Sequence, residues 1–551
     1  MSIETTHHKY EYLKFNKTIV EEYLLLQEKY SKIYNKDKTI ILMQVGGFHE
    51  AYATKTRGFN LHKLGTILKT VVSKKNKKIT EVSEKNPYMM GFPLVATPKY
   101  IQMLINNNFH VIKIDQVTEV PNPKRAITGI YSPGTYIDDI NSQDSKNILS
   151  VFIEEIKQLN NSYILHIGLS IVDLSVGKSI IHETFATKED DKYSLDETLK
   201  FIYNFNPVET IIYYRNLITY TEDELLSYLE LKNKNCLIYE FKTPKYEDVI
   251  YQNKLLTDIF HCESYLTPIE DLDLETLHMG RLSYILLLEY CKKQVSDILL
   301  NIQKPDFYNN LNYLHLGNNA LKQLDAINYN TEEKKESLFD IINYTSTSMG
   351  RRYLKYNICN PLCNGELLND RYNKIDDLNT KNLDLTEKLK NILDIERLHR
   401  KISLRSLSPC DFVNLHDSYH VILSLYDDVK DTKLSTIFIE SIKTELEFFI
   451  IHYNELFNLE EMSKYNLLDI NGSFYKVAIN DEIDELQKKI DNDYLLIESL
   501  RDILETFIDN KKKDYFNLSN DDKSMIQISY NEKDKYYFSL TSKRGEMVKK
   551  G

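Results

Sequence analysis

An aromatic ring and a carboxylate stand two positions apart directly after two glycines, in the stretch MQVGGFHEAY at residues 43–52. Gly46 and Gly47 can act as a structural hinge that brings the backbone close to a ligand and exposes the next side chain. Side chains two positions apart on a strand point to the same side. Phe48 and Glu50 are therefore predicted to face one ligand together.

A ring and a carboxylate in one site suit the recognition of a nucleic-acid base. An exposed ring can enter a base step as a wedge and stack on one base. The carboxylate repels phosphates, so its useful contact is a hydrogen bond to a base edge. The pair therefore predicts a binding site for a base that has lost its pairing partner. The competing interpretation is that Phe48 packs in the core and Glu50 faces solvent.

The distribution of charge favours nucleic acid more than the total does. The formal net charge is −12, but residues 1–135 hold 20 Lys and Arg against 11 Asp and Glu. A basic segment on an acidic chain is typical of a nucleic-acid-binding end. Its densest cluster is predicted to contact the DNA backbone, unless it is only a solvated loop: Lys74, Lys75, Lys77 and Lys78.

Two catalytic motifs are incomplete. The stretch VGKS at residues 176–179 ends like a phosphate-binding loop, but Val172 stands where GxxxxGK[ST] requires its first glycine. No other such motif occurs in the 551 residues. Two-metal nuclease chemistry needs several converging carboxylates. Asp173, with Glu154 or Glu155, is the candidate set, and the residues flanking Asp173 supply no further carboxylate.

The six cysteines form no CxxC pair, so they predict reduced thiols and no metal site. We expect no catalytic residue, no metal and no cofactor in this chain. The first residues are polar and charged, and no run approaches the ~20 apolar residues of a membrane span. No membrane association is predicted.

The elements that position these residues follow from periodicity. Residues 1–140 read as an α/β domain, with a helix before the strand that leads to Phe48, and a helix followed by a strand over 97–117. Residues 145–265 read as a second α/β domain. In it, 162–185 alternate as a hairpin that turns at SVGK.

From about residue 270 the pattern becomes helical. One helix is predicted over 282–302, and another over 336–359 that stops before Pro361. Apolar residues recur with coiled-coil spacing from Ile483 to Phe507. Residues 524–544 then alternate as a pair of strands. The predicted fold class is multidomain α/β plus α.

These residues resemble the MutS family of DNA mismatch-recognition proteins. Phe48-His49-Glu50 matches the family's Phe-x-Glu mismatch-reading motif, with His49 where the family often has Tyr. The biased composition resembles the branch found in giant viruses, some bacteria and octocoral mitochondria. Six further segments are similar to family motifs, in the same order along the chain: residues 88–117, 124–138, 316–327, 337–362, 394–412 and 529–544.

The resemblance implies four domains. They are a mismatch-recognition domain at 1–140, an RNase H-like connector at 145–265, a helical core and lever at 270–465, and a clamp with long helices and a small sheet at 466–551. It implies binding to double-stranded DNA with mismatches or small loops. Lys543 and Arg544 are candidate backbone contacts in the clamp.

Family members continue into an ATPase, and the sequence predicts that this chain stops short of it. ATP and Mg²⁺ are then expected only with that domain, and a homodimer or a separate ATPase chain is the expected assembly. The expected location is intracellular and soluble, in the viral factory, cytoplasm or virion of a large DNA virus. The alternative functions are a binder of DNA junctions or recombination structures, and an RNase H-like nuclease.

Overall fold

The structure is a computed structural model in which the chain divides into two compact units. The first unit holds residues 1–407 and 417–439, and the second holds 408–416 and 440–551. The residues that the structure describes are 12–118, 123–137, 143–159, 161–232, 234–262, 264–295, 297–308, 313–314, 316, 320–328, 336–437, 440–467, 470, 472–513, 526–531 and 535–549.

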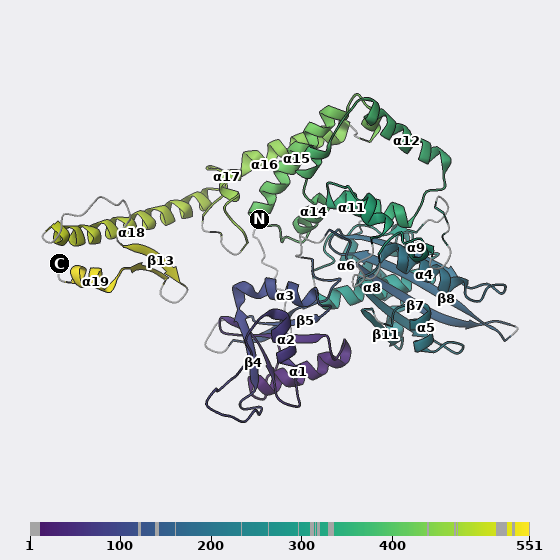
Figure 1. The fold of residues 1–551 in the computed structure, drawn as a ribbon, viewed down its shortest axis with the longest axis horizontal. Helices are drawn as coiled ribbons and strands as arrows, with labels where there is room; N and C mark the ends of the chain where they lie inside the picture. The colour runs from purple at the N-terminus through teal and green to yellow at the C-terminus, as the bar shows by residue number, and fades with distance from the viewer. Residues whose placement is uncertain are drawn as a thin grey trace. The chain divides into compact units, whose positions relative to one another are not determined.

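The first α/β domain is built on a six-stranded sheet of order β3-β4-β2-β1-β5-β6. Figure 1 labels two of its strands, β4 and β5, and the helices α1, α2 and α3 of the same domain. Only β1 and β5 pair in parallel among the six strands, and the other pairs are antiparallel. The elements are α1 (Ile19–Ile33), β1 (Thr39–Val45), β2 (Phe48–Ala53), α2 (Leu61–Leu68), β3 (Ser73–Lys74), β4 (Tyr88–Pro93), η1 (Leu94–Ala96), α3 (Thr97–Ile105), β5 (His110–Gln116) and β6 (Arg125–Tyr131).

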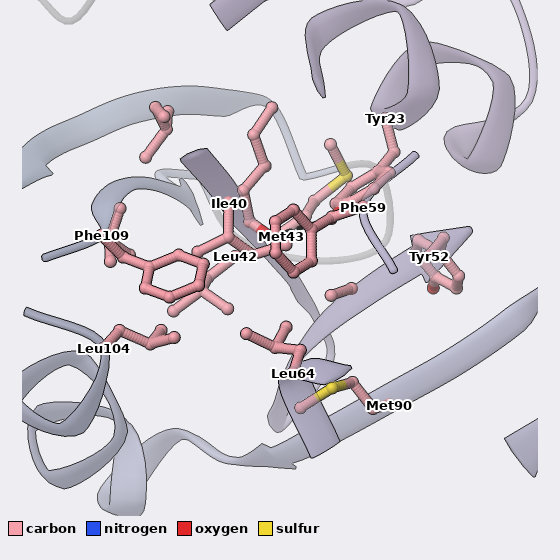
Figure 2. Close-up of a cluster of buried hydrophobic side chains, with 14 of the residues drawn as sticks. Tyr23, Ile40, Leu42, Met43, Tyr52, Phe59, Leu64, Met90, Leu104 and Phe109 are labelled. Atoms are coloured by element: carbon pink, nitrogen blue, oxygen red, sulfur yellow. Dashed lines mark hydrogen bonds between the residues drawn. The ribbon is translucent and has the colours of Figure 1, made fainter. Parts of the chain in front are cut away.

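Local sequence explains why α1 lies on this sheet. The helix begins at a capping box, in which the side chains of Thr18 and Glu21 satisfy free backbone N–H groups at its first turn. Its apolar stripe then packs on β1 and β2, where the Tyr23 and Tyr52 rings meet edge to face. Figure 2 shows this core, in which the Phe59 ring also meets Phe109 edge to face.

The second α/β domain has the strand order β11-β10-β7-β8-β9-β12. The predicted hairpin is confirmed as β8 and β9, and its turn carries Val176 and Gly177, whose φ is +80°. VGKS therefore lies at a hairpin turn and not at a phosphate-binding loop. The elements are β7 (Asn147–Lys157), β8 (Tyr163–Asp173), β9 (Lys178–Phe185), α4 (Tyr193–Phe205), β10 (Glu209–Arg215), α5 (Glu222–Tyr228), β11 (Cys236–Glu240), η2 (Pro244–Tyr246), α6 (Val249–Phe260), α7 (Pro268–Asp271), α8 (His278–Gln294) and β12 (Asp306–Phe307).

A buried carboxylate joins the two α/β domains. Glu209, at the start of β10, is fully buried and accepts hydrogen bonds from His110 Nε2 (3.2 Å), Ser132 Oγ (2.5 Å) and the Tyr290 hydroxyl. Burial alone would raise the pKa of Glu209, but these donors outweigh burial and hold its pKa below the ordinary value. One side chain thus ties β5 and the segment after β6 to β10 and α8.

Two of the predicted helices are wrong in extent. The helix expected over 336–359 is broken in two, because the Thr347 hydroxyl accepts from Gly350 N (3.0 Å) and starts a new helix there. Its end before Pro361 is confirmed. The helix expected over 282–302 ends at Gln294, where the backbone turns extended. The helices of this region are α9 (Ala320–Gln323), α10 (Leu338–Ile342), α11 (Ser348–Cys359), α12 (Gly365–Thr380), α13 (Thr386–Lys390), α14 (Ile395–Ser403), α15 (Pro409–Val429) and η3 (Lys433–Thr436).

The second unit contains a long helix and a two-stranded sheet (Figure 1). The predicted apolar seam lies on α18, where Leu486, Ile490 and Leu500 are about half exposed. The strand pair predicted within 524–544 is confirmed. No helix in the ranges given above is long and apolar enough to cross a membrane. The elements are α16 (Glu440–Leu456), α17 (Leu459–Met462), α18 (Asp481–Lys513), β13 (Gln527–Asn531), β14 (Lys535–Ser539) and α19 (Ser542–Lys549).

Candidate nucleic-acid interface

The two glycines form a tight turn. Strands β1 and β2 pair antiparallel up to Val45 and Phe48, so only Gly46 and Gly47 connect them. Gly46 has φ +58°, a left-handed conformation that favours glycine. The predicted hinge is therefore the turn of a β-hairpin, because the strand resumes at once at Phe48. A Cβ added at either glycine would meet no atom within 4 Å, so the tip is open to a ligand.

Phe48 is 49% exposed, whereas His49 is 2% exposed. This alternation places Phe48 and Glu50 on one side of β2 and His49 on the other. Phe48 does not belong to the buried cluster of this domain, which includes its strand neighbours Ala51, Tyr52 and Ala53. Core packing therefore does not account for the Phe48 ring.

The carboxylate of Glu50 is oriented by a buried tyrosine. The Tyr52 hydroxyl donates a hydrogen bond to Glu50 Oε2, and burial together with this bond raises the pKa of Tyr52. Glu50 Oε1 accepts no hydrogen bond from the described residues. Across the sheet, Gly91 pairs with Glu50, and a Cβ at Gly91 would lie 3.1 Å from Glu50 Cγ. Gly91 thus leaves room for a side chain that has one acceptor available.

His49 braces the strand that carries Phe48. Its Nε2 donates to Asp115 Oδ1 (2.9 Å), and the Thr97 hydroxyl lies 2.8 Å from its Nδ1. Asp115 also contacts Lys113 Nζ (2.7 Å) and the Thr128 hydroxyl (2.5 Å). Burial alone would raise the pKa of Asp115, but the bonds from His49, Lys113 and Thr128 lower it to about 2. This chain of contacts fixes β2 to β5, β6 and the start of α3.

Replacing Asp115 with asparagine is expected to destabilise the first domain by about 2 kcal/mol at pH 7, at ~1.4 kcal/mol per pKa unit. Because the folded-state pKa is depressed, this stability is present above the ordinary value of 3.8 and is lost as the pH falls toward 2. Thermal melting of wild type and Asp115→Asn at pH 7, 4 and 3 should show that the difference between their melting temperatures becomes smaller as the pH falls. Asp376→Asn is the control, because Asp376 is exposed on α12. A difference in melting temperature between wild type and Asp115→Asn that does not change with pH would contradict the stabilising role of the Asp115 carboxylate.

The lysine cluster lies on an ordered loop. Asn86 is 3% exposed, and its side-chain amide donates to Ile79 O (3.2 Å) and Glu81 O (3.0 Å) and accepts from Asn76 N (2.7 Å). Lys74 Nζ donates to Thr80 O (2.7 Å), so this ammonium supports the loop. Three of the predicted backbone contacts remain exposed: Lys75, Lys77 and Lys78.

The other predicted backbone contacts lie on α19 in the second unit. Arg544 is half-buried, and the side chain of Lys543 falls outside the described residues. Helix α19 follows the β13–β14 hairpin, whose Tyr536 ring meets Tyr494 of α18 edge to face. Their role in DNA binding stays a prediction.

The nuclease candidates do not converge. Asp173 accepts from Ser175 N (3.0 Å) and Oγ (2.6 Å) within its turn, and Glu154 forms a two-pronged ion pair with Arg215. Asp173 pairs with the residue seven positions before Glu154 on β7, so the two carboxylates lie roughly 23 Å apart at ~3.3 Å per residue. Within the described ranges no three His, Cys, Asp or Glu side chains form a group suited to a metal ion.

The residues that support the site were not predicted from the sequence. The inward position of His49 could have been predicted, because the period of two that puts Phe48 and Glu50 outward puts His49 inward. Thr97 and Asp115 lie 48 and 66 residues from His49 in the chain, so local pattern does not connect them to it.

Two family models match the chain: MutS domain I at residues 25–140 and MutS domain III at residues 319–535. A DNA mismatch repair protein mutS homolog of Acanthamoeba polyphaga mimivirus is 34% identical over 97% of this chain and 50% of its own length. The chain belongs to the MutS family. The domain I match includes the hairpin tip and the lysine loop of this MutS chain.

More distant MutS relatives are found in bacteria and archaea. The DNA mismatch repair protein MutS of Petrotoga mobilis is 26% identical over 86% of this chain and 52% of its own length. That of Methanosarcina barkeri is 24% identical over 93% of this chain and 54% of its own length. This MutS chain spans about half the length of the curated relatives it matches.

Proposed function

We propose that this chain binds mismatched DNA in DNA mismatch repair. Phe48 stacks on a mispaired base, and Glu50 hydrogen-bonds the edge of the same base. The observation that carries the proposal is the exposed Phe48 ring on a braced hairpin, beside a carboxylate with a free acceptor, inside the MutS domain I match. The relatives that are named as DNA mismatch repair proteins support it.

The direct test compares duplexes that differ in one base pair. Fluorescence anisotropy of the 551-residue chain with matched, G·T and single-base-loop duplexes should give tighter binding to the two defective duplexes. Equal affinity for all three would contradict mismatch recognition. Preference for four-way junctions over G·T duplexes would favour the alternative junction binder, which no contact described above supports.

The lysine loop is expected to supply affinity without discrimination, because phosphate contacts carry no sequence information. Replacing Lys75, Lys77 and Lys78 with alanine should weaken binding to matched and G·T duplexes by similar factors. The slope of log affinity against log salt should fall by at most ~2.7, at ~0.9 per phosphate. Titrations at several salt concentrations measure both quantities.

A matched control for the loop uses three exposed lysines of the second α/β domain. Their replacement by alanine should leave the salt slope close to that of wild type. An unchanged slope in the loop variant would show that its lysines are only solvated. The control residues are Lys188, Lys232 and Lys254.

We expect these 551 residues to show no ATP hydrolysis, because their one GK[ST] sequence lies at the β8–β9 turn, where Lys178 Nζ is paired with Glu396 (2.8 Å). Phosphate release should stay at the buffer level with and without DNA. Release that follows the protein through a second purification and is lost in Lys178→Ala would contradict this. ATP and Mg²⁺ are proposed to act only with an ATPase domain.

The wider assembly is proposed from the family. We propose a dimer around DNA, formed by two copies or with an ATPase-bearing chain, and an intracellular location. The RNase H-like character of the connector is supported by the antiparallel β7–β9, followed by β10 and β11, which run parallel to β7. The core, lever and clamp assignments rest on the domain III match and on the long helix α18.

A further inference from the structure

A second exposed apolar side chain lies beside the hairpin tip. Val95, in the single turn of η1, is 82% exposed and lies outside the buried cluster of this domain. Pro93, two positions before Val95, pairs directly with Phe48 across the β2–β4 ladder. Paired Cα atoms lie ~5 Å apart and two residues span at most ~7 Å, so Val95 Cα lies within roughly 12 Å of Phe48 Cα.

Two tethers fix this turn to the strand that carries Phe48. On one side of Val95, Leu94 N donates to Gly47 O at the hairpin turn (3.1 Å). On the other side, the Thr97 hydroxyl is 2.8 Å from His49 Nδ1, and His49 is held in turn by Asp115. Val95 is therefore presented at a set position relative to the ring and is not carried on a loose loop.

We propose that Val95 is a second DNA contact, an apolar side chain that packs in the minor groove one to three base steps from the base read by Phe48. The proposal rests on the mismatch-binding function proposed above and adds a residue to it. Proteins that kink DNA from the minor groove do so with apolar wedges such as Phe, Leu, Ile and Met between or against base steps. An uncharged side chain also enters the groove without repulsion from phosphates.

The contact explains how the tip tells kinked from straight DNA. A wedge ring opens the minor groove at its own step, and a mispaired step costs less to deform than a paired one. Val95 then gains contact only where the duplex has bent around Phe48. Its contribution should appear in binding to mismatched duplexes and be nearly absent from binding to matched duplexes.

The test is a titration of wild type, Val95→Ala and Val95→Ile against matched and G·T duplexes. Removal of two buried methyl groups predicts roughly 10-fold weaker binding of Val95→Ala to G·T DNA, with matched DNA little changed. Val95→Ile keeps the apolar contact and should bind G·T DNA like wild type. The fluorescence of 2-aminopurine placed one, two or three steps from the G·T pair should differ between the wild-type and Val95→Ala complexes at one of those steps.

Ile250→Ala is the matched control, since Ile250 is 79% exposed on α6 of the second α/β domain. It should not change binding to either duplex. If Val95→Ala binds G·T DNA like wild type, or weakens matched DNA equally, the inference is overturned while the proposed function stands. If wild type itself shows no preference for G·T DNA, the proposed function fails and the inference fails with it.

Discussion

Replacing Phe48 with alanine is expected to weaken binding to mismatched DNA by about 5- to 150-fold. Base–aromatic stacking is worth roughly 1–3 kcal/mol, and ~1.4 kcal/mol corresponds to a factor of ten. The ring is half exposed and outside the buried core cluster, so its removal should not unfold the domain. Binding to matched DNA depends on phosphate contacts and should barely change.

The measurement is a titration of matched, G·T and single-base-loop duplexes at two salt concentrations. Phe185→Ala is a matched control, because Phe185 is 44% exposed on β9 of the second α/β domain. Equal weakening of matched and mismatched DNA by Phe48→Ala would show that the ring is structural. That result would remove the basis of the proposed function.

Glu50→Gln separates the charge from the contact in the same experiment. Glutamine keeps an oxygen that accepts from the Tyr52 hydroxyl, so the side chain should stay in place. It removes a charge that repels phosphates. Matched-DNA affinity should therefore rise, and discrimination should fall with less loss of mismatch binding than in Phe48→Ala.

Replacing Glu209 with alanine is expected to cost about 3–5 kcal/mol of stability. The substitution leaves three buried donors, from His110, Ser132 and Tyr290, without their common acceptor. Glu209→Gln keeps the shape and one acceptor oxygen, so it should cost less. Urea unfolding of the 551-residue chain, monitored by circular dichroism, measures the free energy of unfolding of both variants.

Glu240→Ala is the control for a carboxylate at the sheet surface. Glu240 lies on the neighbouring strand β11, is 52% exposed and pairs with Lys242. Exposed ion pairs contribute ~0–1 kcal/mol, so this variant should unfold close to wild type. If Glu209→Ala is as stable as Glu240→Ala, the Glu209 carboxylate does not stabilise the contact between the two α/β domains.

Periodicity predicted the elements whose faces differ in burial. The alternation in 162–185 gave the β8–β9 hairpin, and the helical stripe after Thr18 gave α1, because each pattern depends on neighbours a few residues away. The helix predicted over 336–359 failed at Thr347. Threonine is favoured at a helix N-cap but also occurs inside helices, so its type alone does not place a helix start, and the bond from Gly350 N does.

The candidate site was predictable where it is local and not where it is tertiary. Phe48 and Glu50 could be paired from spacing alone. The contacts of Val95 and Asp115 depend on strand register and on loops that return to the hairpin tip. The Glu209 carboxylate binds the side chains of Ser132, Tyr290 and His110, which are separated from it by 77, 81 and 99 positions in the chain. No spacing rule relates positions so far apart in sequence.

The loop that Asn86 organises bears on the speed of encounter with DNA. The Asn86 contacts hold the backbone that carries the exposed lysines of the loop before any duplex arrives, so little backbone conformational entropy is lost on docking. Positive charge arranged in this way raises the rate of diffusional arrival more than it lengthens residence. The association rate would then be high and independent of sequence. The residence time at a site would depend on whether the Phe48 ring meets a base step that is easily deformed.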